Sequence, residues 1–144
     1  MIQDLPQRAQ RAQSEANGSF VRDPLTEKII GAAIEVHRIL GPGLLESVYE
    51  QALCHEFDLR GISYQCQACV EMVYKDKVIK DQRIDLLVED QGDRVVVDLK
   101  SLSRLPEIST AQVLSYLKAT GLRRGLIINF GEKRLVDGVR RLSL

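Results

Sequence analysis

The stretch RIDLLVEDQGDRVVVDLKS, residues 83–101, has the pattern of two strands joined by a tight turn. Both arms are rich in Val, Leu and Ile, and Gln91-Gly92 lies between them with the composition of a two-residue hairpin turn. A turn at this position fixes the register of the hairpin. The predicted facing pairs are Val88 with Val95, Leu86 with Val97, and Ile84 with Leu99. One face of the hairpin should therefore be aliphatic.

The other face of this predicted hairpin carries charges. The same register places Asp85 opposite Asp98, and Lys100 points to the same face because side chains alternate along a strand. Two opposed carboxylates destabilise a sheet unless something offsets their repulsion. Protonation of one carboxylate, an ion pair with Lys100, or a bound divalent cation would do so, and paired carboxylates are ordinary ligands of Mg²⁺. The alternative is a solvated charged face on a half-exposed sheet.

A third acidic residue lies in GPGLLESVYE, residues 41–50. Gly43, Glu46 and Tyr49 are three residues apart, so in a helix they form one stripe, which borders an apolar side carrying Leu45 and Val48. A carboxylate at the edge of a core is costly unless it is paired or bound to a metal. Glu46 is therefore a candidate third acidic group above the hairpin. The alternative is an edge glutamate whose head group reaches water.

The rest of the chain predicts one α/β domain. Residues 1–22 are poor in large apolar side chains and are expected to form a flexible N-terminal arm, which leaves residues 23–144 as a single domain. Helices are expected over residues 24–40, 44–59, 108–119 and 132–141, and strands over residues 64–73, 77–89, 94–101 and 125–130. Asp23 and Pro24 should start the first helix, and Gly61 and Gly121 should end the second and third.

Composition limits the class of protein. The chain has 144 residues, 44% of them hydrophobic and 28% charged, which is the balance of a soluble globular domain. No apolar run approaches the ~20 residues that cross a bilayer, and the start lacks a secretory signal, so we expect a cytoplasmic protein without membrane association. The three cysteines are expected to be reduced thiols.

Several motifs, taken together and in order, resemble the GxxExxY proteins of the PD-(D/E)XK nuclease superfamily. GLLESVY (43–49) resembles the family signature, IDLLV (84–88) its first metal-binding strand, and VDLK (97–100) its (D/E)XK element. QVLSYL (112–117) resembles its QxxxY helix, and GLIINFG and VDGVRR resemble its closing strand and tail. The resemblance covers about residues 23–142.

The resemblance implies a restriction-endonuclease-like core, with a mixed sheet of four to five strands flanked by helices. It implies that Glu46, Asp85 and Asp98 hold Mg²⁺, or possibly Mn²⁺, and that Lys100 is the catalytic lysine. Gln112 and Tyr116 would be an accessory catalytic pair, since four residues apart they share a helical face. The implied activity is Mg²⁺-dependent hydrolysis of nucleic acid, with DNA as the expected substrate.

Two positions depart from the family pattern and keep an alternative open. Many relatives have Glu where Asp98 stands, and a His is common where this chain has Ser109. The alternative is a catalytically inactive binding or regulatory module with the nuclease fold. A structural subunit that binds a basic partner is a third reading, but it does not account for opposed aspartates.

Basic residues in the second half are candidate phosphate contacts, because neutralising the backbone gives sequence-independent affinity. They are Lys118, Arg123, Arg124, Arg134, Arg140 and Arg141. Cys66 and Cys69 form a CxxC, but a zinc or iron–sulfur site normally needs four ligands. Cys54, His37 or His55 could contribute, although ordinary packing or surface cysteines are the simpler interpretation.

Overall fold

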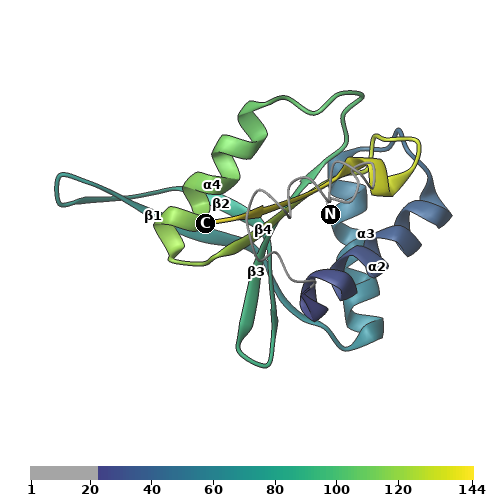
Figure 1. The fold of residues 1–144 in the computed structure, drawn as a ribbon, viewed down its shortest axis with the longest axis horizontal. Coiled ribbons are helices and arrows are strands. Elements are labelled where there is room, and N and C mark those ends of the chain that lie inside the picture. The colour runs from purple at the N-terminus through teal and green to yellow at the C-terminus, as the bar shows by residue number, and fades with distance from the viewer. Residues whose placement is uncertain (1–22) are drawn as a thin grey trace.

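The computed structural model describes residues 23–144, so the predicted N-terminal arm, residues 1–22, lies outside the described part. A five-stranded sheet has helices on both faces: α2 and α3 cover one face and α4 covers the other (Figure 1). The helices are α2 (Pro24–Leu40), α3 (Glu46–Arg60), α4 (Ile108–Thr120) and the short 3₁₀ helix η1 (Leu135–Gly138). The strands are β1 (Ser63–Tyr74), β2 (Lys77–Asp90), β3 (Asp93–Lys100), β4 (Arg124–Asn129) and β5 (Val139–Ser143).

The sheet is mixed and its order follows the sequence, β1-β2-β3-β4-β5. β3 and β4 are parallel, and every other neighbouring pair is antiparallel. Parallel neighbours need a crossover connection, which α4 supplies across one face of the sheet. The prediction of a mixed α/β sheet flanked by helices is confirmed.

The predicted helix ends are confirmed. The Asp23 carboxylate accepts hydrogen bonds from the Thr26 backbone N–H and hydroxyl, and Pro24 occupies the first turn of α2. Gly61 and Gly121 end α3 and α4 with φ of 71° and 75°, values that strain any residue with a Cβ.

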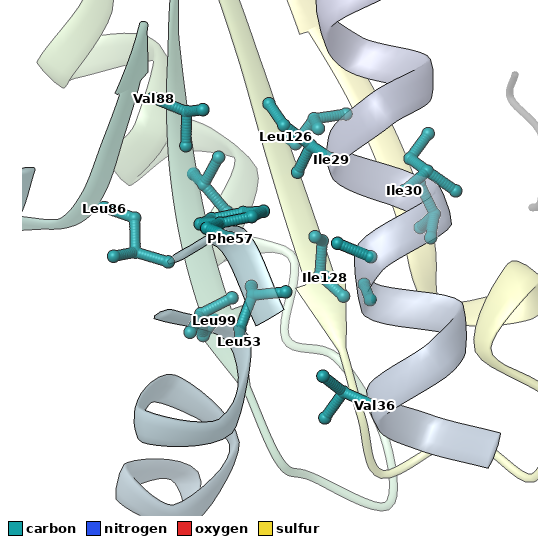
Figure 2. Packing of buried hydrophobic residues seen from close by; sticks show 14 of the residues in the cluster. Ile29, Ile30, Val36, Leu53, Phe57, Leu86, Val88, Leu99, Leu126 and Ile128 are labelled. Carbon is teal, nitrogen blue, oxygen red and sulfur yellow. The ribbon is translucent and has the colours of Figure 1, made fainter. Parts of the chain in front are cut away.

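The core between the sheet and α2/α3 is built on the aliphatic face predicted from residues 83–101. Val88 pairs with Val95 and Leu86 with Val97, as expected from the turn. These side chains meet Ile29 of α2 and Leu53 and Phe57 of α3 (Figure 2). A second cluster, which includes Val96, Val113 and Ile127, fills the space under α4.

Two expectations about elements are wrong. Residues 132–141 form η1 and the start of β5 instead of a closing helix. β5 pairs with the otherwise free edge of β4, which satisfies backbone groups that a helix there would leave unpaired. Leu45 and Val48 are 75% and 37% exposed, because α3 turns a narrower face, Tyr49, Leu53 and Phe57, toward the sheet.

No helix in residues 23–144 is long and apolar enough to cross a membrane.

Candidate active site

The regular pairing of β2 and β3 ends one residue before the predicted pair of aspartates. The ladder runs from Asp90–Asp93 to Leu86–Val97 and stops, so Asp85–Asp98 and Ile84–Leu99 are not ladder pairs. In place of a partner strand, one carboxylate oxygen of Asp85 accepts a hydrogen bond from the Leu99 backbone N–H (2.8 Å). Asp85 thus satisfies the backbone where the ladder opens.

β1 bends at the same level. The pairing of β1 with β2 skips Gln67 and Asp85, and Gln67 has a φ of 52°, a left-handed conformation that is uncommon for a residue other than glycine. The bend also interrupts the alternation of β2: Leu86 packs in the α2/α3 cluster and Ile84 in the cluster under α4. The predicted placement of Ile84 on the same face as Leu86 is therefore wrong.

Asp98 is the most enclosed acidic group of the site, with 6% of its surface exposed. Its Oδ2 lies 2.8 Å from Lys100 Nζ, yet among residues 23–144 it is the buried side-chain oxygen without a well-aligned hydrogen bond. Burial raises the pKa of Asp98 to about 6; Lys100 opposes this shift and the charge of Asp85 adds to it. The two carboxylates are therefore close even though their backbones do not pair.

Lys100 is the last residue of β3, and both its side chain and its backbone carbonyl have partners. Burial alone would lower the pKa of Lys100, but the Asp98 ion pair and the charges of Glu46 and Asp85 outweigh it and raise the pKa. The Lys100 carbonyl accepts a hydrogen bond from the Phe130 N–H (2.8 Å). Asn129, which is fully buried, bonds both the N–H and the carbonyl of Leu102 (2.9 and 3.0 Å). Sequence reasoning did not single out Asn129.

Glu46 is the first residue of α3, and its position depends on Tyr49. The Tyr49 ring is buried and stacks on Phe130 with centroids 4.4 Å apart. Its hydroxyl donates to the Gly41 carbonyl and accepts from the Leu44 N–H, which fixes the loop that leads into α3. Glu46 is exposed as a whole residue, and partial burial of its carboxyl and the charge of Asp85 raise its pKa.

Two further side chains, Gln67 and Glu50, belong to the site and were not predicted. The Gln67 amide donates to Glu50 Oε1 (3.1 Å) and makes a long contact with Asp85 Oδ1 (3.5 Å). Glu50 follows Glu46 by four residues, so this spacing could have indicated a second acidic residue on the same helical face. Nothing in the local sequence around Gln67 indicates its role, because the role depends on the bend in β1.

The two residues of the predicted accessory pair differ in exposure: Tyr116 is buried and Gln112 is exposed. The Tyr116 hydroxyl donates to Gln82 Oε1 (3.0 Å); burial and the charges of Asp98 and Asp85 raise the pKa of Tyr116. The Gln112 side chain makes no hydrogen bond within residues 23–144. Ser109, at the position of the family histidine, is 2% exposed.

Most of the predicted phosphate contacts lie away from the carboxylates. Arg124 precedes Gly125, which pairs with Val96 near the start of β3, and it is engaged by Asp23 (3.1 Å) and Asp93 (3.4 Å). Arg123 is its exposed neighbour, and exposed Lys118 lies in the last turn of α4. Arg140 instead lines a cavity of ≈ 600 Å³, together with Arg104 and Asn129, near the exit of β3.

The other predicted basic residues divide similarly. Arg134 is exposed, whereas Arg141 forms an ion pair with Glu27 of α2 (2.8 Å). His37 is buried beside Phe130 with its Nε2 2.8 Å from the Glu132 carbonyl oxygen, and so is not a partner of the cysteines.

The candidate metal ligands are the carboxylates of Glu46, Asp85 and Asp98. In the part of the chain that the structure describes, no group of three or more His, Cys, Asp or Glu side chains is arranged to hold a metal, so Glu46, Asp85 and Asp98 are not a preassembled trio. Asp98 Oδ2 nevertheless lacks an aligned hydrogen bond, and Asp85 Oδ1 has only its long contact with Gln67. Two such carboxylates fit Mg²⁺, which keeps several waters in its coordination shell.

One comparison with known proteins identifies the family. The family model for the PD-(D/E)XK nuclease superfamily matches residues 23–142. No curated protein matches the chain significantly. A solved structure titled "Crystal structure of SSO0001" is 17% identical, with 92% of this chain and 74% of that chain covered, and its TM-score of 0.42 is too low to support a conclusion. On the family match, this chain belongs to the PD-(D/E)XK nuclease superfamily.

Proposed function

We propose that the chain is a Mg²⁺-dependent nuclease that hydrolyses phosphodiester bonds of DNA, and that within its superfamily it is a GxxExxY protein. Asp98 carries the proposal: its carboxylate is 6% exposed, lies beside Asp85 and Lys100, and keeps one oxygen without an aligned hydrogen bond. The Lys100 ammonium offsets part of the cost of burying this carboxylate, and a bound divalent cation would offset more of it.

Asp85 and Asp98 would hold the metal, and Glu46 would reach it directly or through water. When bound, the metal would supply charge neutralisation at the phosphate and acidify a water. The backbone N–H of Leu99 holds one oxygen of Asp85, and the other oxygen has only the long 3.5 Å contact with the Gln67 amide, which a metal could replace. Manganese would satisfy the same oxygen ligands.

Lys100 would act on the reacting atoms. Its ammonium lies within 2.8 Å of Asp98, which keeps the side chain protonated and directed at the carboxylates. From there it can bind a phosphate oxygen or orient the attacking water, which are roles for a positioned cation in phosphoryl chemistry. Tyr116 borders the same space and is the member of the predicted accessory pair that the geometry favours.

Basic side chains near the exit of β3 would bind the DNA backbone. Arg140 and Arg104 line one cavity there. Arg124 is a weaker candidate, since it would have to leave two carboxylates to bind a phosphate. Arg123 and Lys118 could contact only DNA that extends toward the start of β4.

The second candidate function is a binding or regulatory module without turnover. It is favoured by Gln112, which is exposed and unpaired within residues 23–144, and by Ser109 at the position of the family histidine. Such a module would bind nucleic acid through the same basic residues and leave it intact.

Cleavage assays separate these candidates. Labelled single-stranded, duplex and branched DNA, with RNA as a comparison, are incubated with the full chain in Mg²⁺ or in EDTA. We expect cleavage in Mg²⁺ that Lys100→Met abolishes and that Lys77→Met, at an exposed lysine that begins β2, does not. Binding of any of these substrates without cleavage would favour the module.

Magnesium binding is tested independently of cleavage. A ligand that binds only the folded state raises its stability in proportion to the logarithm of ligand concentration. The melting temperature should rise with millimolar Mg²⁺ in the wild type and not in Asp98→Asn. An equal rise in both proteins would place the metal elsewhere.

A further inference from the structure

The structure pairs the cysteines differently from their spacing in the sequence. Cys66 and Cys69 form the CxxC, but Cys66 lies against Cys54, with the two sulfur atoms 3.0 Å apart. Cys69 instead contacts the Lys80 carbonyl oxygen at 3.7 Å. The close pair therefore joins α3, which carries Cys54, to β1, which carries Cys66.

The two sulfurs are already near bonding distance. A disulfide bond is about 2.05 Å long, so an approach of about 1 Å would form one. The two residues are 12 apart in sequence, and Cys54 lies in α3 whereas Cys66 lies in β1. The bond would therefore close a short loop and link the helix to the sheet. We propose that Cys54 and Cys66 are a redox modification site, where a peroxide converts the dithiol into a disulfide that fastens α3 to β1.

The two thiols have different roles in this reaction. Cys66 is exposed and would meet the oxidant first, whereas burial and the contact with Cys66 raise the pKa of Cys54 to about 12 and keep it a thiol. The Cys66 sulfur attacks one oxygen of hydrogen peroxide; the O–O bond breaks, the other oxygen leaves as water, and Cys66 becomes a sulfenic acid. The Cys54 sulfur then attacks the Cys66 sulfur, its proton joins the departing hydroxide, and a second water leaves.

The bond would run beside a contact of the candidate active site. Cys54 follows Glu50 by one helical turn, and Cys66 directly precedes Gln67, whose amide bonds Glu50 at 3.1 Å. Oxidation would therefore fix α3 and β1 together without displacing either element. The proposal does not depend on nuclease activity, because its test reads bond formation and stability.

The test treats the reduced full chain with excess hydrogen peroxide. We expect the intact mass to fall by about 2 Da, peptide mapping to join Cys54 to Cys66, and the melting temperature to rise by about 5–10 °C, reversibly with dithiothreitol. Cys69→Ser is the matched control and should behave as the wild type does. Cys54→Ser and Cys66→Ser should show no such rise.

Other products would overturn the proposal. A bond between Cys66 and Cys69, a bond between two chains, or a sulfinic acid on Cys66 with Cys54 still free would each show that the pair does not react as a unit. Peptide mapping of the wild type decides this even if a cysteine variant folds poorly.

Discussion

The two halves of the β2–β3 hairpin differ in strand pairing and in polarity. Between the Leu86–Val97 pair and the turn, the two strands are fully paired. Four side chains of this half are completely buried: Leu86, Val88, Val95 and Val97. Beyond Leu86 the ladder opens, and Asp85 and Asp98 lie close to each other around Lys100. The same two strands thus supply both the core and the candidate site.

The difference shows how a sheet can hold two carboxylates. If the pairing continued, Asp85 and Asp98 would face each other directly across the strands, which is destabilising. The ladder stops before this position, where Gln67 of β1 has a left-handed backbone and the Leu99 N–H donates to the Asp85 carboxylate. The paired half gains stability from apolar burial, and the open half holds the buried Asp98 carboxylate beside the Lys100 ammonium. The predictions that follow separate these two halves.

The largest effect is expected from Lys100 in the open half. Lys100→Ala should lower kcat for cleavage by about 10²–10⁴-fold, because it removes a positioned cation from the reacting atoms. Single-turnover cleavage of labelled DNA measures this, with circular dichroism as the check on folding. A loss of less than about threefold would remove Lys100 from the mechanism.

The paired half should instead respond in stability. Leu86→Ala leaves a cavity in a completely buried position and should lower the free energy of unfolding by about 2–5 kcal/mol. Leu59→Ala, at a position 68% exposed, is the control and should change it by less than about 0.5 kcal/mol. Urea unfolding measures both variants. Equal effects would mean that this half is not the packed core.

Asp98→Asn should act on stability in the other direction. Because burial raises the pKa of Asp98 to about 6, the folded state prefers the protonated form. The stability that this group contributes is complete below its unfolded pKa, about 3.9, and is lost as the pH rises through about 6. At pH 7 without divalent metal, Asp98→Asn should therefore be more stable than the wild type by roughly 1–3 kcal/mol.

The pH dependence checks the cause of that gain. Thermal melts in EDTA from pH 4 to pH 8 should show the two proteins converging toward pH 4. A variant that is less stable than the wild type at pH 7 would mean that the ion pair with Lys100 outweighs the burial of Asp98.

The smallest effect is expected at Gln67, which supports Asp85 and Glu50 without facing the substrate directly. Gln67→Leu should reduce kcat/KM by about 3–10-fold and weaken the Mg²⁺ dependence, as loss of an outer partner of a metal ligand does. Gln65→Leu, an exposed glutamine on the same strand, should have no effect. Equal losses in both variants would assign the defect to β1 as a whole.

The sequence was sufficient where the structure depends on neighbouring residues. Asp23-Pro24 and the glycines at 61 and 121 mark helix ends by local chemistry, and the turn at Gln91-Gly92 sets the first pairs of the hairpin. The family motifs also predicted the mixed sheet. These features need no knowledge of the distant parts of the chain.

The sequence was insufficient where distant segments decide the outcome. The ladder opens at Asp85 beside the bend of β1 at Gln67, 18 residues earlier, and the two side chains are in contact. Residues 139–143 form a strand because the edge of β4 is available to them, although their local pattern suggested a helix. Gln67 and Asn129 were missed for the same reason, since each acts through a partner in another element or loop, whereas the spacing of Glu50 from Glu46 was a local signal that was overlooked.

A crystal structure of the protein soaked in Mn²⁺ tests the central claim most directly, because anomalous scattering locates the ion without reference to activity. We predict a peak in contact with Asp98 Oδ2 and an oxygen of Asp85 that is absent from crystals of Asp98→Asn. A peak elsewhere, or none at these carboxylates at millimolar Mn²⁺, would contradict the assignment of the open half of the hairpin as a metal site.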